Sequence, residues 1–480
     1  CIRDRCSTLC GTCPAGETCV DTAGTRICAP DPAAAVLVQE NVACGVEGST
    51  PLEVTLGADT LSFTVVVRGP DENRVAVRQL TTPGFTVLLD VMDGLRDINP
   101  VNHYPGAGAL IVPSTDDLRA VPVAGTWSLR LGLFEKGSVD PLVPVAGVMS
   151  QVRVMVVRAA AEGGILDVDV HVAPGLGVDA QAGDMDPFLG AMVEQFETLL
   201  ESAAFIQLGN IHFHALQDAA LTVLDDGDEV RAMAAANAVG GMRVNVFLVE
   251  SLAFAAGFSG TIPGPPGLAG SPASGLVITQ LGSGRDTGVL LAHETLHFLG
   301  LRHTTELGGG TDAISDTPEC PSGTELQDCP DYQNLMFPNF PLGGTLALSP
   351  VQRSLARGSV LLQEVPRAGV CPPTFVVDVT GVNKANGILA AATLDEECGA
   401  ETDGERVHLL RADGAWTITA VGDGFEPRVL LLSGACDGEK LGCQALTPDA
   451  EMELQSTSGV TFVVVRGPVG GMYRLTVEPR

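Results

Sequence analysis

The chain has 480 residues, of which 45% are hydrophobic and 18% are charged, with 57 glycines and 31 prolines. That length is enough for two to four domains, and the composition is globular with many turns. The formal net charge of −31 argues against nucleic acid and against an anionic membrane surface as partners, because both would repel it. No apolar run in the sequence approaches the roughly 18 to 20 residues that a membrane-spanning helix needs.

The thirteen cysteines are unevenly distributed along the chain. Six of them lie between residues 6 and 44, in the N-terminal tenth of the sequence. This pattern predicts a disulfide framework that forms in an oxidising compartment, with partners inferred only from proximity. The last six form three pairs that are close in sequence: Cys320 with Cys329, Cys371 with Cys398, and Cys436 with Cys443.

Cys1 is the cysteine left over when the other twelve are paired. No signal peptide precedes it, so the sequence reads as a mature form. A mature chain that begins with cysteine resembles a bacterial lipoprotein, whose first residue carries the lipid; the alternative is a sequence cut arbitrarily at a cysteine. A lipidated Cys1 would tether the protein to a membrane without spanning it. We therefore expect an extracytoplasmic protein, either a bacterial surface lipoprotein or a secreted one.

The two ends of the chain have β-like or cysteine-rich patterns. Residues 1–32 hold too many cysteines and turn residues for an apolar core, which predicts a small disulfide-stapled module. Residues 33–162 contain strand-like segments such as TLSFTVVVRG and GTWSLRLGLF between turn residues, which predict a β-sandwich. Residues 367–480 repeat the pattern in TFVVDVTG and VTFVVVRG, which predict a second β-sandwich.

The middle of the chain, residues 163–366, follows a different pattern. A strand at ILDVDVHV precedes a helix over DPFLGAMVEQFETLLESA, which begins at Asp186, and strands follow at IHFHAL and RVNVFLVE. This order predicts an α/β (α+β) domain flanked by the two β-sandwiches. His212 and His214 fall on one face of a predicted strand, and without a third partner nearby we interpret them as packing or solvent-facing residues.

The segment HETLHFLGLRH places three of the eight histidines within eleven residues. We expect a helix over about residues 287–299, capped by Asp286, because the pattern there is helical and aspartate favours the N-cap position. His293 and His297 are four residues apart on this helix, so both imidazoles can point at one ion.

Gly300 stands where this helix must end, and glycine tolerates the left-handed turn that ends it. The chain can then return and present His303 as a third ligand. Three neutral imidazoles and a water molecule make an open tetrahedral zinc site, which is the catalytic kind. Glu294 is placed to reach the water and accept its proton as general base. Three core histidines are the simpler alternative, but buried imidazoles without partners are unfavourable.

The pattern H-E-x-x-H-x-x-G-x-x-H, followed downstream by a methionine turn, resembles the metzincin zinc peptidases. The turn is NLMFPNF, with Met336 in the place of the methionine beneath the zinc. TIPGPPG, SGLVI, SDTPEC and LSPVQRSLAR are similar to the pappalysin-like group of metzincins. That group has a tyrosine two residues after the methionine, where this chain has Pro338 as in the matrixin version of the turn, and Tyr332 is not in register to replace it.

The resemblance implies a substrate cleft in which a peptide pairs as an extra strand beside an edge strand from residues 251–262. It also allows Ca²⁺ in acidic loops such as GGGTDAISD, although a solvated acidic loop is the plainer interpretation. The C-terminal segments GACDGEKLGC and GGMYRLTVEP are similar to segments of bacterial pre-peptidase C-terminal domains, which accompany secreted proteases.

The motif and the resemblance together predict a secreted or surface-anchored zinc endopeptidase that acts on a protein or peptide substrate. Zn²⁺ would be held by His293, His297 and His303, with Glu294 as the general base. The alternative is a surface binding or adhesion lipoprotein with an inactive metzincin-like domain, and the intact Glu294 and Met336 favour the enzyme. The sequence does not indicate the cleavage specificity or the oligomeric state.

Overall fold

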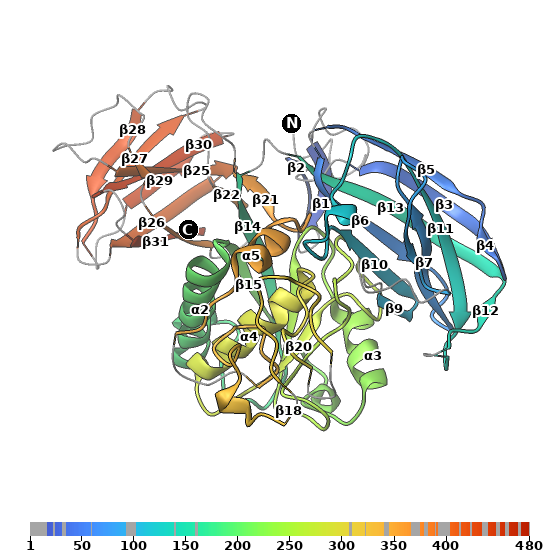
Figure 1. Ribbon diagram of the computed structural model, residues 1–480. Helices are drawn as coiled ribbons and strands as arrows, with labels where there is room; N and C mark the ends of the chain where they lie inside the picture. Colours follow the sequence, from blue (N-terminus) through green and yellow to red (C-terminus); the bar gives the residue numbers. More distant parts are fainter. Residues whose placement is uncertain are drawn as a thin grey trace. The chain divides into compact units, whose positions relative to one another are not determined.

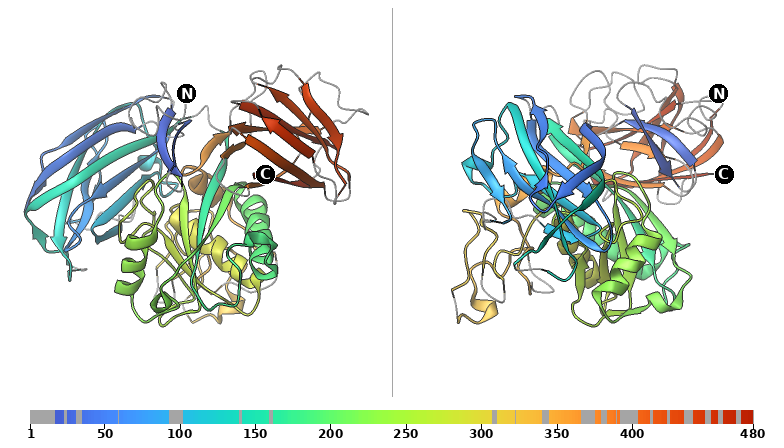
Figure 2. Two further views of the ribbon diagram at one scale, coloured as in Figure 1. Left: turned by 180° about the vertical axis from the view of Figure 1, so that it is seen from behind. Right: turned by 90° about the vertical axis from the view of Figure 1, so that its right-hand side faces the viewer.

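The structure, a computed structural model, is drawn in Figure 1 and from two further directions in Figure 2. Cys1, Cys371, Cys398 and Cys436, for which we predicted lipidation or disulfides, lie outside the described residues. The structure describes residues 17–22, 25–30, 35–58, 60–92, 102–138, 141–158, 162–306, 310–321, 323–339, 345–365, 375–378, 383–388, 390–391, 404–411, 414–422, 425–433, 440–447, 452–456, 460–468 and 472–479.

The chain divides into two compact units. The first contains Cys1–Ala159, Asp169–Phe205 and Phe213–Gln363, and the second contains Ala160–Val168, Ile206–His212 and Glu364–Arg480. The domain boundaries that we placed at residues 32, 162 and 366 stay predictions. No helix in the described part of the chain is long and apolar enough to cross a membrane.

The N-terminal cysteine-rich segment contains one described hairpin. Strands β1 (Glu17–Thr22) and β2 (Thr25–Pro30) are antiparallel, and their register places the Cα atoms of Cys19 and Cys28 opposite each other. The remainder of the predicted module lies outside the described residues.

The predicted N-terminal sandwich of two separate sheets is wrong. The strands form one curled, antiparallel, eleven-stranded sheet, because the short strand β9 pairs with β7 on one side and with β10 on the other. The curl lets distant strands share one core, to which Val54, Val67 and Trp127 all belong. The strands are β3 (Ala35–Gly45), β4 (Gly48–Ser49), β5 (Leu52–Leu56), β6 (Thr60–Arg68), β7 (Asn73–Thr81), β8 (Val87–Asp90), β9 (Asn102–Pro105), β10 (Ala107–Val112), β11 (Gly125–Glu135), β12 (Pro144–Val145) and β13 (Gly147–Arg158), with a 3₁₀ turn at Leu118–Ala120.

Cys44, at the end of β3, corrects our expectation that all cysteines other than Cys1 pair. Its thiol is free, and only 4% of the residue is exposed. Burial raises the pKa of this thiol to about 11.

The segment that carries the histidine motif contains a six-stranded sheet with the order β15-β14-β17-β20-β19, and β21 pairs with β14. Strand β20 is parallel to β17 and antiparallel to β19, so β19 is the last strand at this edge among the described residues. The strands are β14 (Glu162–Val172), β15 (Gln207–Ala215), β17 (Val244–Val249), β19 (Gly257–Ser259), β20 (Leu276–Thr279) and β21 (Gln363–Val365); β16 (Val223–Leu224) and β18 (Ser251–Leu252) form a separate parallel pair.

The expected fold class, with an α/β metzincin-like domain between sandwiches, is wrong. The described chain is mostly β-sheet, and an α/β catalytic domain is not what the structure shows. Helical periodicity extends over only a few short segments, and most of the described residues between 299 and 349 have irregular backbone rather than the repeated helices of an α/β fold. The described helices are α2 (Pro187–Leu199), α3 (Gly227–Asn237), α4 (Gly284–Phe298) and α5 (Pro350–Arg357), with a π-helical turn at Leu200–Ala204 and 3₁₀ turns at Gly183–Met185, Ala219–Leu221 and Leu326–Asp328.

Helix α2 begins where the sequence predicts. Asp186 is its N-cap, and one carboxylate oxygen accepts hydrogen bonds from the backbone N–H groups of Phe188 (2.9 Å) and Leu189 (3.1 Å).

Helix α4 begins three residues earlier than we predicted. Its N-cap is Ser283 rather than Asp286, and the Ser283 hydroxyl accepts the backbone N–H of Asp286 at 3.1 Å. Ser283 in turn donates to the Asp286 carboxylate at 2.8 Å. Serine and aspartate are both good N-cap residues. Here Ser283 is the N-cap, and Asp286, three residues later, is its hydrogen-bond partner.

Helices α2 and α4 pack closely because α4 has glycines on the shared face. A Cβ atom at Gly284 would lie 2.2 Å from the carbonyl oxygen of Phe188, and one at Gly288 would lie 2.4 Å from that of Met192. No side chain can be accommodated there without moving backbone. The close packing fixes the axis of the helix that carries His293 and His297.

The C-terminal strands lie in two sheets that share one apolar core, which includes Trp416, Leu431 and Leu475. The predicted strands at TFVVDVTG and VTFVVVRG are confirmed as β22 and β30. One sheet contains β22 (Phe375–Asp378), β24 (Ala390–Ala391), β25 (Gly404–Arg411), β27 (Arg428–Ser433), β28 (Lys440–Ala445) and β30 (Val460–Gly467), and the other contains β23 (Asn383–Ile388), β26 (Gly414–Gly422), β29 (Met452–Ser456) and β31 (Met472–Pro479). Cys443 is disulfide-bonded, and its predicted partner Cys436 lies outside the described residues.

Gly288→Ala should destabilise the protein, because the new methyl group would force the backbone of α2 away from α4. Overpacking of this kind costs about 1–3 kcal/mol, which exceeds the gain of up to about 1 kcal/mol from alanine's helix propensity. Thermal unfolding would show a lower midpoint for Gly288→Ala than for wild type. Gly282→Ala is the matched control, since nothing lies within 4 Å of a Cβ atom there. Equal midpoints for the two variants would contradict this account of the packing.

Candidate metal centre

The three histidines of the motif converge on one point. His293 and His297 lie on α4 and are 3% and 4% exposed, and His303 follows the end of the helix. The Nε2 atom of His303 lies 3.2 Å from Nε2 of His293 and 3.1 Å from Nε2 of His297. The structure therefore brings together the three residues that we predicted as metal ligands.

The opposite nitrogen of each ring has its own acceptor. Nδ1 of His293 lies 2.7 Å from the carbonyl oxygen of Leu335, and Nδ1 of His297 lies 2.8 Å from that of Leu301. Nδ1 of His303 lies 3.1 Å from a carboxylate oxygen of Glu306. Carbonyl and carboxylate oxygens accept hydrogen bonds, so these partners assign the proton of every ring to Nδ1.

This assignment leaves a lone pair on each Nε2 atom at the point of convergence. The short contacts between these nitrogens are then not hydrogen bonds, because none of the three carries a proton there. A cation placed between these three acceptors, two of them buried, would relieve their mutual repulsion. Burial lowers the pKa of His293 to about 3 and lowers that of His297 well below its usual value, so both rings are neutral at pH 7. Neutral imidazole is the form that binds metal, and the three residues fit zinc.

The end of α4 makes the third ligand available. Gly300 has φ +114°, a conformation that residues with a side chain rarely adopt, and its N–H bonds to the carbonyl oxygen of His297 at 2.9 Å. The N–H of Leu301 bonds to Leu296 at 3.0 Å, which reverses the chain. The reversal also returns the Leu301 carbonyl to the ring of His297.

The methionine turn holds two of the ligands at once. The Leu335 carbonyl orients His293, and the next carbonyl, that of Met336, accepts the N–H of Thr304, the residue after His303, at 3.1 Å. The Met336 side chain is fully buried. Asn334, which sequence reasoning missed, fixes the turn by accepting the Met336 N–H on its side-chain oxygen at 2.8 Å.

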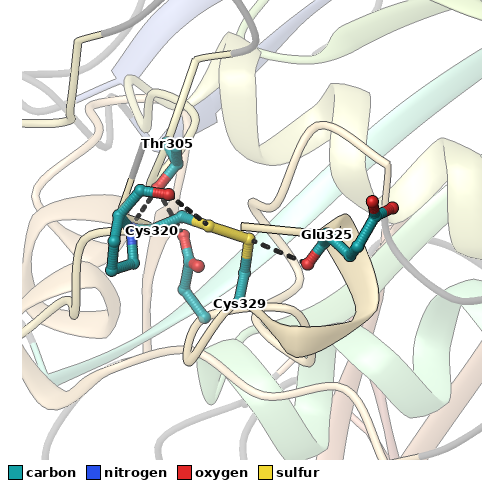
Figure 3. Close-up of a disulfide and its surroundings, with 6 residues drawn as sticks. Thr305, Cys320, Glu325 and Cys329 are labelled. Carbon is teal, nitrogen blue, oxygen red and sulfur yellow. Dashed lines mark hydrogen bonds between the residues drawn. A yellow bond between two sulfur atoms is a disulfide. The ribbon is translucent and has the colours of Figure 1, made fainter. Parts of the chain in front are cut away.

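A disulfide loop anchors the segment that follows His303, as Figure 3 shows. The structure joins Cys320 and Cys329, and the backbone N–H of Cys320 donates to the hydroxyl of Thr305 at 3.1 Å. The same hydroxyl donates to Asp331 at 2.7 Å. Atoms of Cys320, Cys329 and Asp331 are close enough to hold an ion, but the two sulfurs are engaged in the disulfide. We interpret this group as an anchor.

The predicted general base, Glu294, lies on α4 directly after His293. Glu294 is 6% exposed, its carboxylate accepts a hydrogen bond from the backbone N–H of Ser259, and burial raises its pKa to about 8. Ser259 belongs to the edge strand β19. A Cβ atom at Gly257, in the same strand, would lie 2.5 Å from a Glu294 carboxylate oxygen, so only glycine allows the strand to pass this close.

The remaining residues that the resemblance singled out have structural surroundings. The Tyr332 ring packs edge-on against Phe337, with centroids 5.6 Å apart. In the acidic loop, Asp312 accepts hydrogen bonds from Thr317 (2.7 Å) and from the backbone of Ile314 (3.2 Å). Asp316 accepts from Ser349 at 2.6 Å, at the start of α5. These carboxylates are therefore bound within the protein rather than simply solvated, and Ca²⁺ there stays a prediction.

A second histidine group lies outside the motif. The ring of His171 stacks between His214 and Phe247, with centroid distances of 4.8 and 4.6 Å. Its Nε2 donates to the Asn245 side-chain oxygen at 3.0 Å, because that oxygen already accepts the N–H of Val239. Burial lowers the pKa of His171 to about 4. His214 bonds to Asp169 at 2.7 Å, in keeping with a packing role.

No family model matches this chain, and no curated protein matches it. Some solved structures resemble parts of it. The pre-peptidase C-terminal domain of collagenase from Bacillus anthracis is 17% identical and covers 20% of this chain and 87% of its own, with a TM-score of 0.16. PliG from Aeromonas hydrophila, a periplasmic inhibitor of g-type lysozyme, is 12% identical over 22% of this chain and 94% of its own, with a TM-score of 0.17. Likenesses this weak carry no argument about function.

The purified protein should contain about one zinc ion per chain, as an open three-histidine site predicts. His297→Ala should lose it, because two imidazoles bind zinc far more weakly than three. Metal analysis by mass spectrometry checks this, with His103→Ala, on β9 and outside the cluster, as the control that keeps its zinc. A folded wild type that takes up no zinc when zinc is supplied would show that the cluster is not a metal site.

His171 should make the metal-free protein less stable as the pH falls. Between its unfolded pKa of about 6.5 and its folded pKa of about 4, the unfolded chain binds a proton that the folded chain does not. Stability is therefore lost as the pH falls through this window, by up to about 3 kcal/mol. His171→Phe keeps the stacking and removes the titration. Urea unfolding at several pH values, with chelator present, should show a shallower decline for the variant; parallel curves would rule out this role.

Proposed function

We propose that this protein is a zinc-dependent endopeptidase that hydrolyses peptide bonds with Glu294 as its general base. One observation carries the proposal: the Nε2 atoms of three histidines converge, and the carboxylate of Glu294, next to His293 in the chain, is buried, in a motif that resembles that of metzincin peptidases. Three nitrogen ligands leave a zinc ion with an open position, as hydrolysis requires. The substrate class is a protein or peptide.

Different residues would bind the metal and transfer the proton. His293, His297 and His303 would hold Zn²⁺, which supplies Lewis acidity toward the substrate carbonyl and an acidified water. A cation nearby favours the charged form of Glu294, which burial alone disfavours. Glu294 then accepts the proton of the attacking water and passes it to the leaving amine. The Ser259 N–H keeps the carboxylate in place.

The edge strand β19 supports a strand-like mode of substrate binding. Among the described strands it pairs only with β20, and a strand with one partner can pair with an extended peptide along its other edge. Gly257 and Ser259 of this strand lie against Glu294, so a peptide paired there would place its backbone beside the general base. Backbone pairing supplies affinity without a required side chain.

The setting that we propose is extracytoplasmic, as a secreted or surface-anchored protein. The Cys320–Cys329 disulfide supports this, since disulfides persist in oxidising compartments. An adhesion lipoprotein with an inactive site would leave unexplained why a general base is buried beside three ligands.

Glu294→Gln should abolish proteolysis and keep the zinc. General-base catalysis typically contributes about 10²- to 10⁴-fold, so the cleavage rate should fall by at least that range. The assay is cleavage of an unfolded protein and of a mixed peptide library, read by mass spectrometry, with and without chelator. Glu319→Gln, which removes an equal charge from an exposed position, is the control and should cleave like wild type. A fully active Glu294→Gln, or a zinc-loaded wild type that cleaves nothing, would refute the proposal.

A further inference from the structure

Glu306 sets His303 apart from the other two histidines. His293 and His297 donate their Nδ1 protons to neutral backbone carbonyls, whereas His303 donates to a carboxylate at 3.1 Å. The contact lies on the side of the ring opposite to the converging Nε2 atoms.

His303 also needs an orienting partner more than the others do. His293 and His297 are carried by a helix and almost fully buried, whereas the His303 side chain is 24% exposed and lies on irregular backbone. Helix geometry therefore does not fix its ring, and packing restrains it only in part.

Glu306 is itself held by its backbone. Its N–H donates to the carbonyl oxygen of Gly310 at 3.0 Å, and the neighbouring residue Thr305 pairs with Thr311 in an isolated β-bridge. Thr305 is also bonded to Asp331 and to the disulfide loop at Cys320. Hydrogen bonds therefore hold the backbone of residues 305 and 306 in place, and Glu306 contacts the ring of the residue three positions before it.

We propose that Glu306 is a positioning residue that fixes the ring of His303 and raises its strength as a metal ligand. A carboxylate on the outer nitrogen locks the tautomer that leaves Nε2 free and increases the electron density of the ring. Loss of such a partner typically weakens metal binding by about 10- to 100-fold. This inference rests on the proposed zinc site and adds a residue that the motif does not contain.

The test is the zinc affinity of the full chain, measured by competition with a chromogenic chelator. Glu306→Gln keeps an oxygen that can accept the Nδ1 proton but removes the charge, and Glu306→Leu removes both. We expect the zinc dissociation constant to rise about 10-fold or more in Glu306→Gln and further, toward 100-fold, in Glu306→Leu. Glu319→Gln controls for the loss of one exposed negative charge and should stay within about 2-fold of wild type.

Two further readouts separate positioning from a general structural role. Thermal unfolding of the metal-free proteins should give the same midpoint for wild type and Glu306→Gln, because Glu306 is largely exposed. The visible absorption of the cobalt-substituted protein should change in Glu306→Gln and not in Glu319→Gln, since it reports the ligand field. Equal affinities and spectra for Glu306→Gln and Glu319→Gln would overturn the inference while the zinc site itself stands. A wild type that binds neither zinc nor cobalt would overturn both this inference and the proposed function.

Discussion

The convergence of the three histidines depends on one constraint: each imidazole gives its Nδ1 proton to an acceptor on the surrounding loops. The acceptors come from three different places, the turn after α4 at Leu301, the methionine turn at Leu335, and the loop residue Glu306. If one were lost, its ring could rotate or change tautomer and present a proton to the centre instead of a lone pair. The geometry of the ligands is thus a property of the loops around the helix as much as of the helix itself.

The proposed zinc site would link the stability of the fold to metal binding. The Nε2 atom of His303 lies 3.2 and 3.1 Å from the Nε2 atoms of His293 and His297, so their lone pairs repel one another in the metal-free protein, and burial keeps water from the rings of His293 and His297. The fold tolerates the repulsion because α4 is locked against α2 through Gly284 and Gly288, and because the disulfide loop braces the chain beyond His303. If zinc binds here, little of its binding free energy is needed to organise the three histidines, so the proposed site would bind the ion tightly.

The sequence predicted the convergence of the three histidines because their spacing is local: the positions of His293 and His297 and the glycine at position 300 follow from helix geometry. Glu306, Asn334 and Asp331 could not be found in this way, since their roles depend on contacts between segments that have no fixed spacing. The prediction of a β-sandwich at the N-terminus was wrong for a related reason. Alternation identifies strands, but whether they form two sheets or one depended on β9, four residues that pair on both sides. At α4, two adequate caps stood three residues apart, and propensity does not choose between them.

The free thiol of Cys44 has a consequence for how the chain acquires its disulfides. Thiol–disulfide exchange requires the thiolate, and with a pKa of about 11 only about 10⁻⁴ of this cysteine is ionised at pH 7. Once the curled sheet has closed over it, Cys44 neither attacks existing bridges nor joins new ones. Burial of this one side chain thus lowers the number of reactive cysteines in the folded protein, and with it the number of mispaired bridges that an oxidising environment can produce.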